Sequence, residues 1–202
     1  PAGATGATGP AGPQGEPGDS FKHFVLPPVA GDYIDNSISG GALTTMPMSP
    51  NQLRAVPFRP DRTITIDQLG CVVSTAVASG KVVCGIYSSK PSDGSPDALL
   101  LQTAELPTDT ATGVYSTVSM TLVEGQLYWL SYITSASGIS LRGIQPGNCL
   151  STGRLGNGTI TTQGTQLNQN YTYSAELPEL WGEYSPSQRM TSVPASIRMR
   201  IA

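Results

Sequence analysis

Glycine occupies every third position at the start of this chain. Residues 1–18 read PAGATGATGPAGPQGEPG, with glycine at six consecutive third positions: Gly3, Gly6, Gly9, Gly12, Gly15 and Gly18. In a collagen triple helix, every third residue of three polyproline-type strands reaches a crowded axis where only glycine fits. The repeat therefore predicts a collagen-like stalk over residues 1–19 and a homotrimer. The alternative is a flexible Gly/Pro linker that happens to be regular.

The stalk is short for a triple helix. Six triplets extend about 55 Å at about 3.1 Å per residue, and we do not expect so short a segment to trimerise unaided. The part of the chain that follows must then hold the three copies together. Because the chain begins inside the repeat, at Pro1, we expect it to be the C-terminal part of a longer protein.

Residues 20–202 are predicted to form one all-β domain. Short segments rich in Val, Ile, Thr and Tyr alternate with clusters of Gly, Pro, Asn, Asp and Ser, which is typical of antiparallel sheet. This pattern favours a jelly-roll-like antiparallel β-sandwich. Strands are expected at 21–26, 54–58, 63–74, 81–88, 98–106, 115–122, 126–134, 139–144, 171–176 and 192–201. Residues 32–53 are expected to form a loop or an arm reaching a neighbouring subunit, and residues 145–170 a long polar loop.

Charge and hydropathy exclude two classes of partner. The chain has 11 Lys and Arg against 14 Asp and Glu, a net charge of -3, so it lacks the positive surface that nucleic acid requires. Its apolar runs are far shorter than the 20 or so residues of a membrane-spanning helix. With 38% hydrophobic residues, the chain can nevertheless bury a core.

The three cysteines are predicted to be free thiols. If residues 63–88 form one hairpin turning at Ser79 and Gly80, Cys71 and Cys84 share a sheet face about 13 Å apart. A disulfide needs Cα atoms closer than about 7 Å. Cys149 has no evident partner, and an odd count favours assembly in a reducing cytoplasm.

Groups for catalysis or metal binding are sparse. His23 is the only histidine, and no nucleophile-elbow, phosphate-loop or dinucleotide-binding pattern is present. The acidic pairs lack a diagnostic spacing, and Asp93 with Asp97 favours a turn over a calcium loop. We therefore predict no enzyme, no metal site and no cofactor. The alternation over 196–201 places Arg198 and Arg200 on one strand face, which favours a solvated or inter-subunit surface over an anion site.

Sugar binding fits the late segment better. Glycan sites combine an aromatic face with amide and carboxylate groups that bond hydroxyls. The candidate ligand-binding residues are Asn168, Asn170, Tyr171, Tyr173, Glu179, Trp181 and Tyr184. The alternative is that Tyr173 and Trp181 belong to a core or a subunit interface. In the other aromatic cluster, Trp129 is expected on the face opposite Tyr128 and Tyr132.

Two parts of the sequence resemble known fibre proteins. The stalk triplets ATG and PQG resemble collagen-like segments of bacterial and bacteriophage fibres. The order RTITIDQLGCVVSTAVASGKVVCGIYSS, PDALLLQTAEL and LVEGQLYWLSYIT is similar to β-rich terminal domains of phage tail-fibre and other virion-appendage proteins. This resemblance implies a homotrimer whose distal domain recognises a host cell-surface glycan or protein. It transfers no site residues.

The combined features predict a virion fibre head, assembled in the host cytoplasm, that trimerises the fibre and binds a host receptor through several weak sites at once. Other virion fibre or tail proteins are expected partners. One alternative is a purely structural trimerisation head of a bacterial surface or spore filament. A capsule-degrading depolymerase fits less well, because the long internal repeat of such enzymes is not visible.

Overall fold

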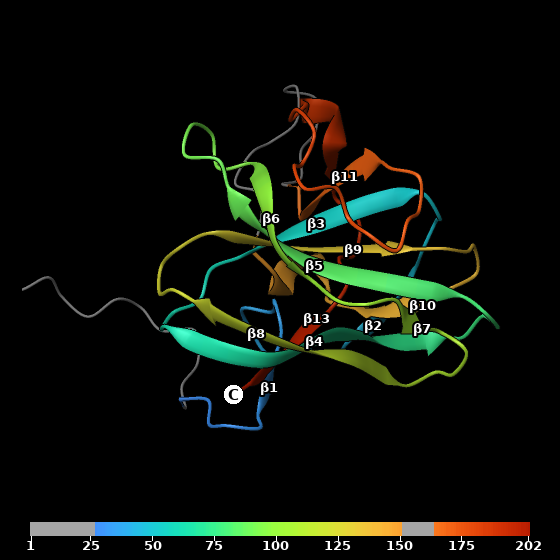
Figure 1. Ribbon diagram of the computed structural model, residues 1–202, viewed down its shortest axis with the longest axis horizontal. Helices are drawn as coiled ribbons and strands as arrows, with labels where there is room; N and C mark the ends of the chain where they lie inside the picture. The colour runs from blue at the N-terminus through green and yellow to red at the C-terminus, as the bar shows by residue number, and fades with distance from the viewer. Residues whose placement is uncertain (1–26, 151–163) are drawn as a thin grey trace, which may run out of the picture.

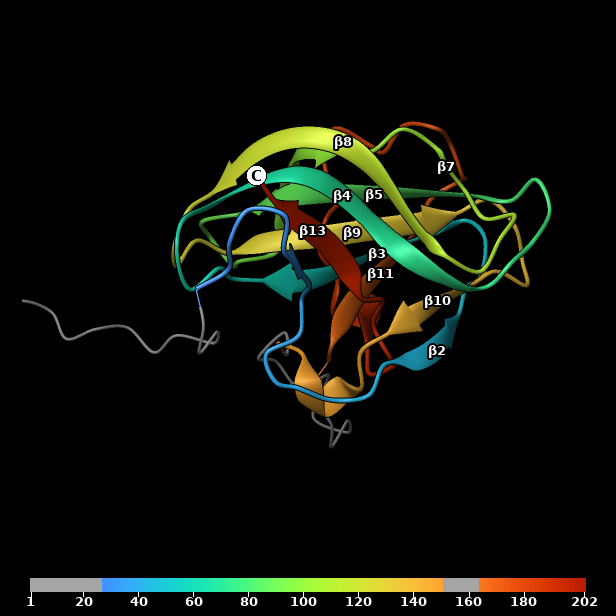
Figure 2. The same ribbon diagram turned by 90° about the horizontal axis from the view of Figure 1, so that it is seen from below.

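Two antiparallel β-sheets face each other across the interior of the protein (Figures 1 and 2). The computed structural model describes residues 27–150 and 164–202. The predicted collagen-like stalk with its six glycines, the strand at 21–26 and His23 all lie outside the described residues. The all-β class and the antiparallel pairing are confirmed for the described residues.

The first sheet has the strand order β1, β13, β4, β10, β2, with β8 also paired to β4. Its strands are β1 (Tyr33–Ile34), β13 (Ile197–Ile201), β4 (Ile64–Thr75), β10 (Ser140–Gly143), β2 (Thr44–Pro47) and β8 (Gly113–Leu122). Figure 2 looks onto this sheet, with β8, β4 and β13 toward the viewer.

The second sheet has the order β12, β11, β3, β9, β5, β6, with β7 also paired to β5. Its strands are β12 (Arg189–Met190), β11 (Gln166–Asn170), β3 (Gln52–Phe58), β9 (Tyr128–Thr134), β5 (Lys81–Ser89), β6 (Pro96–Gln102) and β7 (Leu106–Pro107). Two single-turn 3-10 helices, η1 (Pro146–Asn148) and η2 (Pro186–Gln188), are the helical elements of the described chain.

The main core lies between the two sheets, because alternate residues of their strands point inward. From the first sheet, Ile66 and Leu69 are fully buried, and from the second, Ile86 and Leu130 are fully buried against them. Period-two alternation in the sequence located the inward face correctly at Ile64 and Ile66 and at Ile197, Met199 and Ile201, which all lie in the main core.

The expected hairpin of residues 63–88 is wrong. β4 and β5 belong to different sheets, and the chain crosses between them at the turn where Ser79 adopts a positive φ of 60°. Cys71 and Cys84 therefore face each other across the core, and do not lie along one sheet. Both are free and buried, as predicted, but for a different reason. The neighbouring Cys71 thiol and burial raise the pKa of Cys84 well above its usual range.

Three further segments differ from the expectation. Residues 171–176 are irregular, and the strand lies earlier, as β11. The segment expected to be a loop or arm contains β1 and β2, which pair within the same chain with β13 and β10. The single strand expected at 98–106 is interrupted between β6 and β7. The amide-rich β11 forms because β3 supplies its backbone partners, a long-range effect that local propensity does not register.

Candidate functional site

The chain from Tyr171 to Tyr184 crosses the outer face of the second sheet (Figure 1). Leu177 and Trp181 of this segment are buried in a second core cluster with Val83, Tyr87 and Trp129. Every residue of β9 is consequently buried, since the main core covers one face of the strand and this segment covers the other. The predicted placement of Trp129 opposite Tyr128 and Tyr132 is confirmed.

Specific contacts anchor the covering segment. The Trp181 ring meets the Tyr87 ring edge-on, with centroids 5.4 Å apart and an interplanar angle of 86°. The Tyr87 hydroxyl donates a hydrogen bond to the Pro178 carbonyl at 2.8 Å. Gly85 leaves room for Leu177, because a Cβ at Gly85 would lie 2.4 Å from the Leu177 Cδ1 atom. The sheet surface and its cover therefore fit closely.

The covering segment also extends the sheet by hydrogen bonding to β6. The Leu99 N–H donates to the Glu179 carbonyl at 2.8 Å, and the Trp181 N–H donates to the Asp97 carbonyl at 2.8 Å. Backbone pairing at the edge thus fixes Trp181 in register above Tyr87. The position of this tryptophan is set by tertiary pairing.

Two of the seven predicted glycan residues differ from the rest: Trp181 is buried, and Asn168 is half-buried with its side-chain oxygen enclosed. Trp181 is only 3% exposed, so it belongs to the core, which is the alternative named above for this residue. Asn168 lies on β11 directly opposite Arg54, and its Oδ1 atom is buried without a hydrogen-bond partner in the described part of the chain. The Trp181 side chain is therefore not positioned to contact a surface sugar, and the Asn168 side chain cannot offer its Oδ1 atom to one.

The other five predicted residues form what we call the tyrosine rim: Asn170, Tyr171, Tyr173, Glu179 and Tyr184. Asn170 and Glu179 are exposed, and the three tyrosines are half-buried at the margin of the second core cluster. Tyr171 and Tyr173 lie together, since their backbone N–H groups both donate to Asn51. Half-buried rings with exposed carboxylates nearby are the groups that stack on and bond sugars.

Polar contacts fix the orientation of two rim tyrosines. The Tyr173 hydroxyl donates to the Glu105 carboxylate at 2.7 Å. Burial, followed by this carboxylate, raises the pKa of Tyr173, so its hydroxyl stays protonated. Tyr184 lies under the guanidinium of Arg189, whose Cζ is 5.4 Å from the ring centroid. Both tyrosines are therefore held by neighbouring charged side chains.

The outer face of the first sheet carries a second group of polar and aromatic side chains, which the sequence analysis missed. Cross-strand pairing aligns Tyr33, Arg200, Gln68 and Thr117 in one row. The Tyr33 ring packs on Tyr115, with centroids 5.0 Å apart. Tyr33 was missed because it falls in a segment predicted to be a loop, although the pair Arg198 and Arg200 had marked this strand face.

A β-bulge places Asp67 on this face. Pairing to both neighbouring strands shifts between Ile66 and Gln68, which leaves Asp67 as the extra residue. The Arg200 guanidinium donates two hydrogen bonds of 2.8 Å to its carboxylate. This bond holds the pKa of Asp67 below its usual range.

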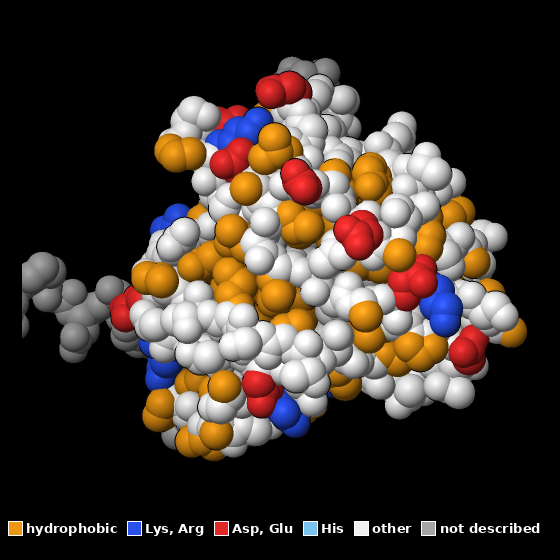
Figure 3. Space-filling view, in the orientation of Figure 1, with side chains coloured by type: hydrophobic (Ala, Val, Ile, Leu, Met, Phe, Trp, Pro, Cys, Tyr) orange, Lys and Arg blue, Asp and Glu red, His pale blue; other side chains and the backbone are white. Residues whose placement is uncertain are grey.

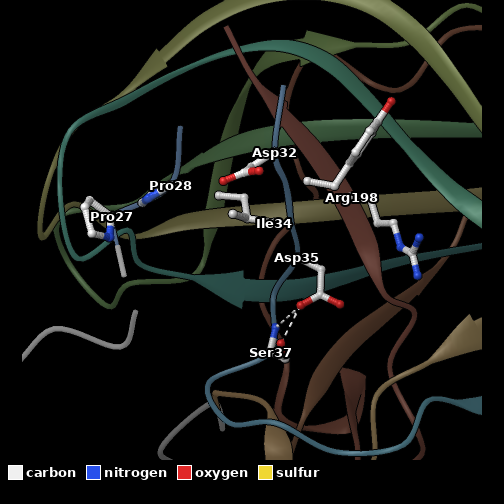
Figure 4. Close-up of a pocket in the computed structure, with 8 residues that line it drawn as sticks. Pro27, Pro28, Asp32, Ile34, Asp35, Ser37 and Arg198 are labelled. Atoms are coloured by element: carbon white, nitrogen blue, oxygen red, sulfur yellow. Dashed lines mark hydrogen bonds between the residues drawn. The ribbon is translucent and has the colours of Figure 1, made fainter. Parts of the chain in front are cut away.

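An open hollow of ≈ 510 Å³ adjoins the same face, where the described chain begins (Figure 4). It is lined by Pro27, Pro28, Asp32, Tyr33, Ile34, Asp35, Ser37 and Arg198. The Asp35 carboxylate is engaged, because it accepts hydrogen bonds from the Ser37 and Ser196 hydroxyls. Arg198 makes no ion pair with a carboxylate among the described residues, and the Asp32 carboxylate accepts a hydrogen bond from the Val29 N–H at 3.0 Å.

Apolar side chains gather on the face shown in Figure 3, and apolar residues of the edge strands β6 and β8 lie at the margin of the main core. Leu101, Val118 and Met120 are only partly buried there against the main core. We call this surface the apolar seam. It is the kind of exposed apolar surface that marks an interaction site on a soluble protein.

The acidic groups do not gather into a site for a metal ion among residues 27–150 and 164–202. Asp93 instead shapes its own turn, accepting hydrogen bonds from the Ser95 N–H at 2.9 Å and the Ser95 hydroxyl at 2.7 Å. Gly94 completes the turn with a φ of +73°. The local sequence Asp-Gly-Ser thus forms the turn expected from its composition.

Fold and surface together define a two-sheet, all-β protein with one covered and one uncovered outer sheet face. A scan against protein-family models finds no match for this chain, and a search of curated proteins finds no relative. Within the described residues, no helix has the length and apolar character needed to cross a membrane.

Proposed function

We propose that this protein is the head of a homotrimeric virion fibre, carried on a collagen-like stalk, and that it binds a host cell-surface glycan through several equivalent sites. The observation that carries the proposal is the junction in the chain. Six Gly-x-y triplets end at Gly18, and the described all-β unit begins at Pro27. A triple helix requires three copies of whatever domain is attached to it.

In the proposed fibre, the head holds the three chains together. The apolar seam supports this role, because Leu101, Val118 and Met120 are left partly exposed in a single chain. Exposed apolar patches of this kind are usually covered in an assembly. The free thiols agree with assembly in the reducing cytoplasm of a host cell.

The tyrosine rim is the proposed glycan surface. It belongs to the segment that covers the second sheet, whereas the described chain starts beside the first sheet, at the lower left of Figure 1. A rim on the side away from the stalk would face outward from a particle. Three shallow sites on one rigid head raise the effective concentration for each further contact, so weak single sites give tight attachment.

Two measurements test this proposal. Light scattering should give a trimer for the full chain and for a variant lacking residues 1–19, and monomers in both cases would overturn the trimeric head. On a glycan array, Tyr173→Ala should lower the signal at least about ten-fold, whereas Tyr173→Phe, which keeps the ring, should retain it. A trimer that binds no glycan would favour the structural-filament alternative, and release of sugar from capsule would favour the depolymerase.

A further inference from the structure

The outer face of the first sheet differs from that of the second in what covers it. The second sheet is covered by its own chain, through Leu177 and Trp181. The first sheet leaves Tyr33 45% exposed, and the adjacent Val29 is 63% exposed. A half-exposed tyrosine and an exposed valine beside an open hollow form a surface suited to a protein partner.

Chain connectivity brings this face close to its own copies. In the proposed trimer, the three Gly18 residues meet at the axis of the stalk. From Gly18 to Pro27 the chain can reach at most about 30 Å, at about 3.3–3.6 Å per residue. Pro27 and Pro28 line the hollow, so this edge of each hollow lies within about 30 Å of the axis.

The charges at the hollow suit a head-to-tail contact. Arg198, from β13, and Asp32, just before β1, make no described ion pair with each other or with another residue. In Figure 4, Arg198 lies on the opposite side of the view from Pro27 and Pro28 and extends away from them. Asp35 is already engaged by Ser37 and Ser196, so Asp32 is the carboxylate left for an incoming cation. Rings of three copies are built from such heterologous contacts, in which two different patches meet.

We infer that the hollow beside β1 is a subunit interface, in which Arg198 of one copy pairs with Asp32 of the next and Tyr33 and Val29 are covered. This interface rests on the proposed trimeric function, and it is the surface through which the three copies would contact one another. An ion pair that becomes partly desolvated at an interface fixes register and partner choice more than it adds affinity.

Charge reversal in the full chain tests the interface. Arg198→Asp should reduce the mass measured by light scattering three-fold, from trimer to monomer, because it places two carboxylates at each contact. Asp32→Arg should do the same, and the double variant Arg198→Asp with Asp32→Arg should restore the trimer. Lys81→Glu, a comparable charge reversal on the second sheet, should leave the mass unchanged. Circular dichroism of each variant confirms that the head is folded.

Each outcome has a distinct meaning. Trimers for both single variants, with the wild-type chain also a trimer, would overturn the interface while leaving the proposed function intact. A monomeric wild-type chain would overturn both. Trimeric single variants that lose glycan-array binding would assign the hollow to the receptor and also overturn the interface. Failure of the double variant to recover the trimer would overturn the pairing of Arg198 with Asp32.

Discussion

The two tryptophans of this protein provide a matched test of how the second sheet is covered. Trp181 and Trp129 are buried to nearly the same extent, at 3% and 4% exposed, in one apolar cluster. Their indole N–H groups differ. The Trp129 Nε1 donates to the Gly94 carbonyl at 2.9 Å, whereas the Trp181 Nε1 is buried without a partner in the described residues.

Replacing each tryptophan by phenylalanine should therefore have unequal effects. Both variants lose similar apolar contact, but Trp129→Phe also loses a hydrogen bond, whose net contribution is about 1 kcal/mol. Trp181→Phe removes a buried donor that has no partner, which offsets part of its lost packing. We expect Trp129→Phe to lower the free energy of unfolding by about 1–2 kcal/mol more than Trp181→Phe. Trp181→Ala should cost about 3–5 kcal/mol, because it leaves a large cavity over Tyr87.

Urea denaturation followed by circular dichroism measures these differences. The protein concentration is held constant across variants, since unfolding of an oligomer depends on it. A Trp181→Phe variant that is as unstable as Trp129→Phe would refute the reasoning, because the Trp181 N–H would then have a partner. A Trp181→Ala variant within about 1 kcal/mol of the wild type would show that the covering segment is not anchored by this ring.

Three further outcomes follow from other contacts. Gly85→Val should destabilise the protein by about 1–3 kcal/mol in the same urea assay, because the added side chain meets Leu177, and an unchanged midpoint would contradict the close fit of the cover. The three buried thiols should react with a thiol reagent at pH 8 only after denaturant is added. Burial also raises the pKa of Cys149 to about 11, so its thiol stays protonated at this pH. Rapid reaction of the native protein would contradict the burial of the thiols. The pKa of Asp67 is lower in the folded protein than in the unfolded chain, where it is about 4. Its bond to Arg200 therefore stabilises the fold fully above about pH 4, and this contribution is lost as the pH falls through the folded pKa. Asp67→Asn should therefore lose less thermal stability than the wild type below about pH 4. The difference should be small, because both side chains are partly exposed to solvent. An unchanged dependence of thermal stability on acid pH would count against the bond.

The sequence determined the local part of this fold. Alternation placed Ile66 and Ile197 on inward faces, and the Asp-Gly-Ser turn at Asp93 followed from its residues. These features depend on a side chain and its near neighbours in the chain, so a single sequence contains the information. The Gly-x-y period is of the same kind, and it predicts a stalk at positions outside the described residues.

The candidate site could be predicted only in part. Tyr171, Tyr173 and Tyr184 were identified as surface aromatic residues by their polar surroundings, and the structure places them at the margin of a core cluster. The burial of Trp181 was left open, because it depends on pairing with Asp97, 84 positions earlier in the chain. The aromatic pair Tyr33 and Tyr115 was not anticipated, since β1 is two residues long and carries no pattern of its own.

Tertiary structure alone decided which strands share a sheet. β4 and β5 are joined by a short turn, which favours a hairpin on local grounds, yet they pack against each other from opposite sheets. That choice brings Cys71 and Cys84 together across the core and leaves β5 free to pair with β9. The physical reason is that a strand has two equivalent edges, and which partner occupies each edge depends on burial summed over the whole domain. Local sequence sets the face that a strand buries, whereas the packing of the complete chain sets the strand beside it.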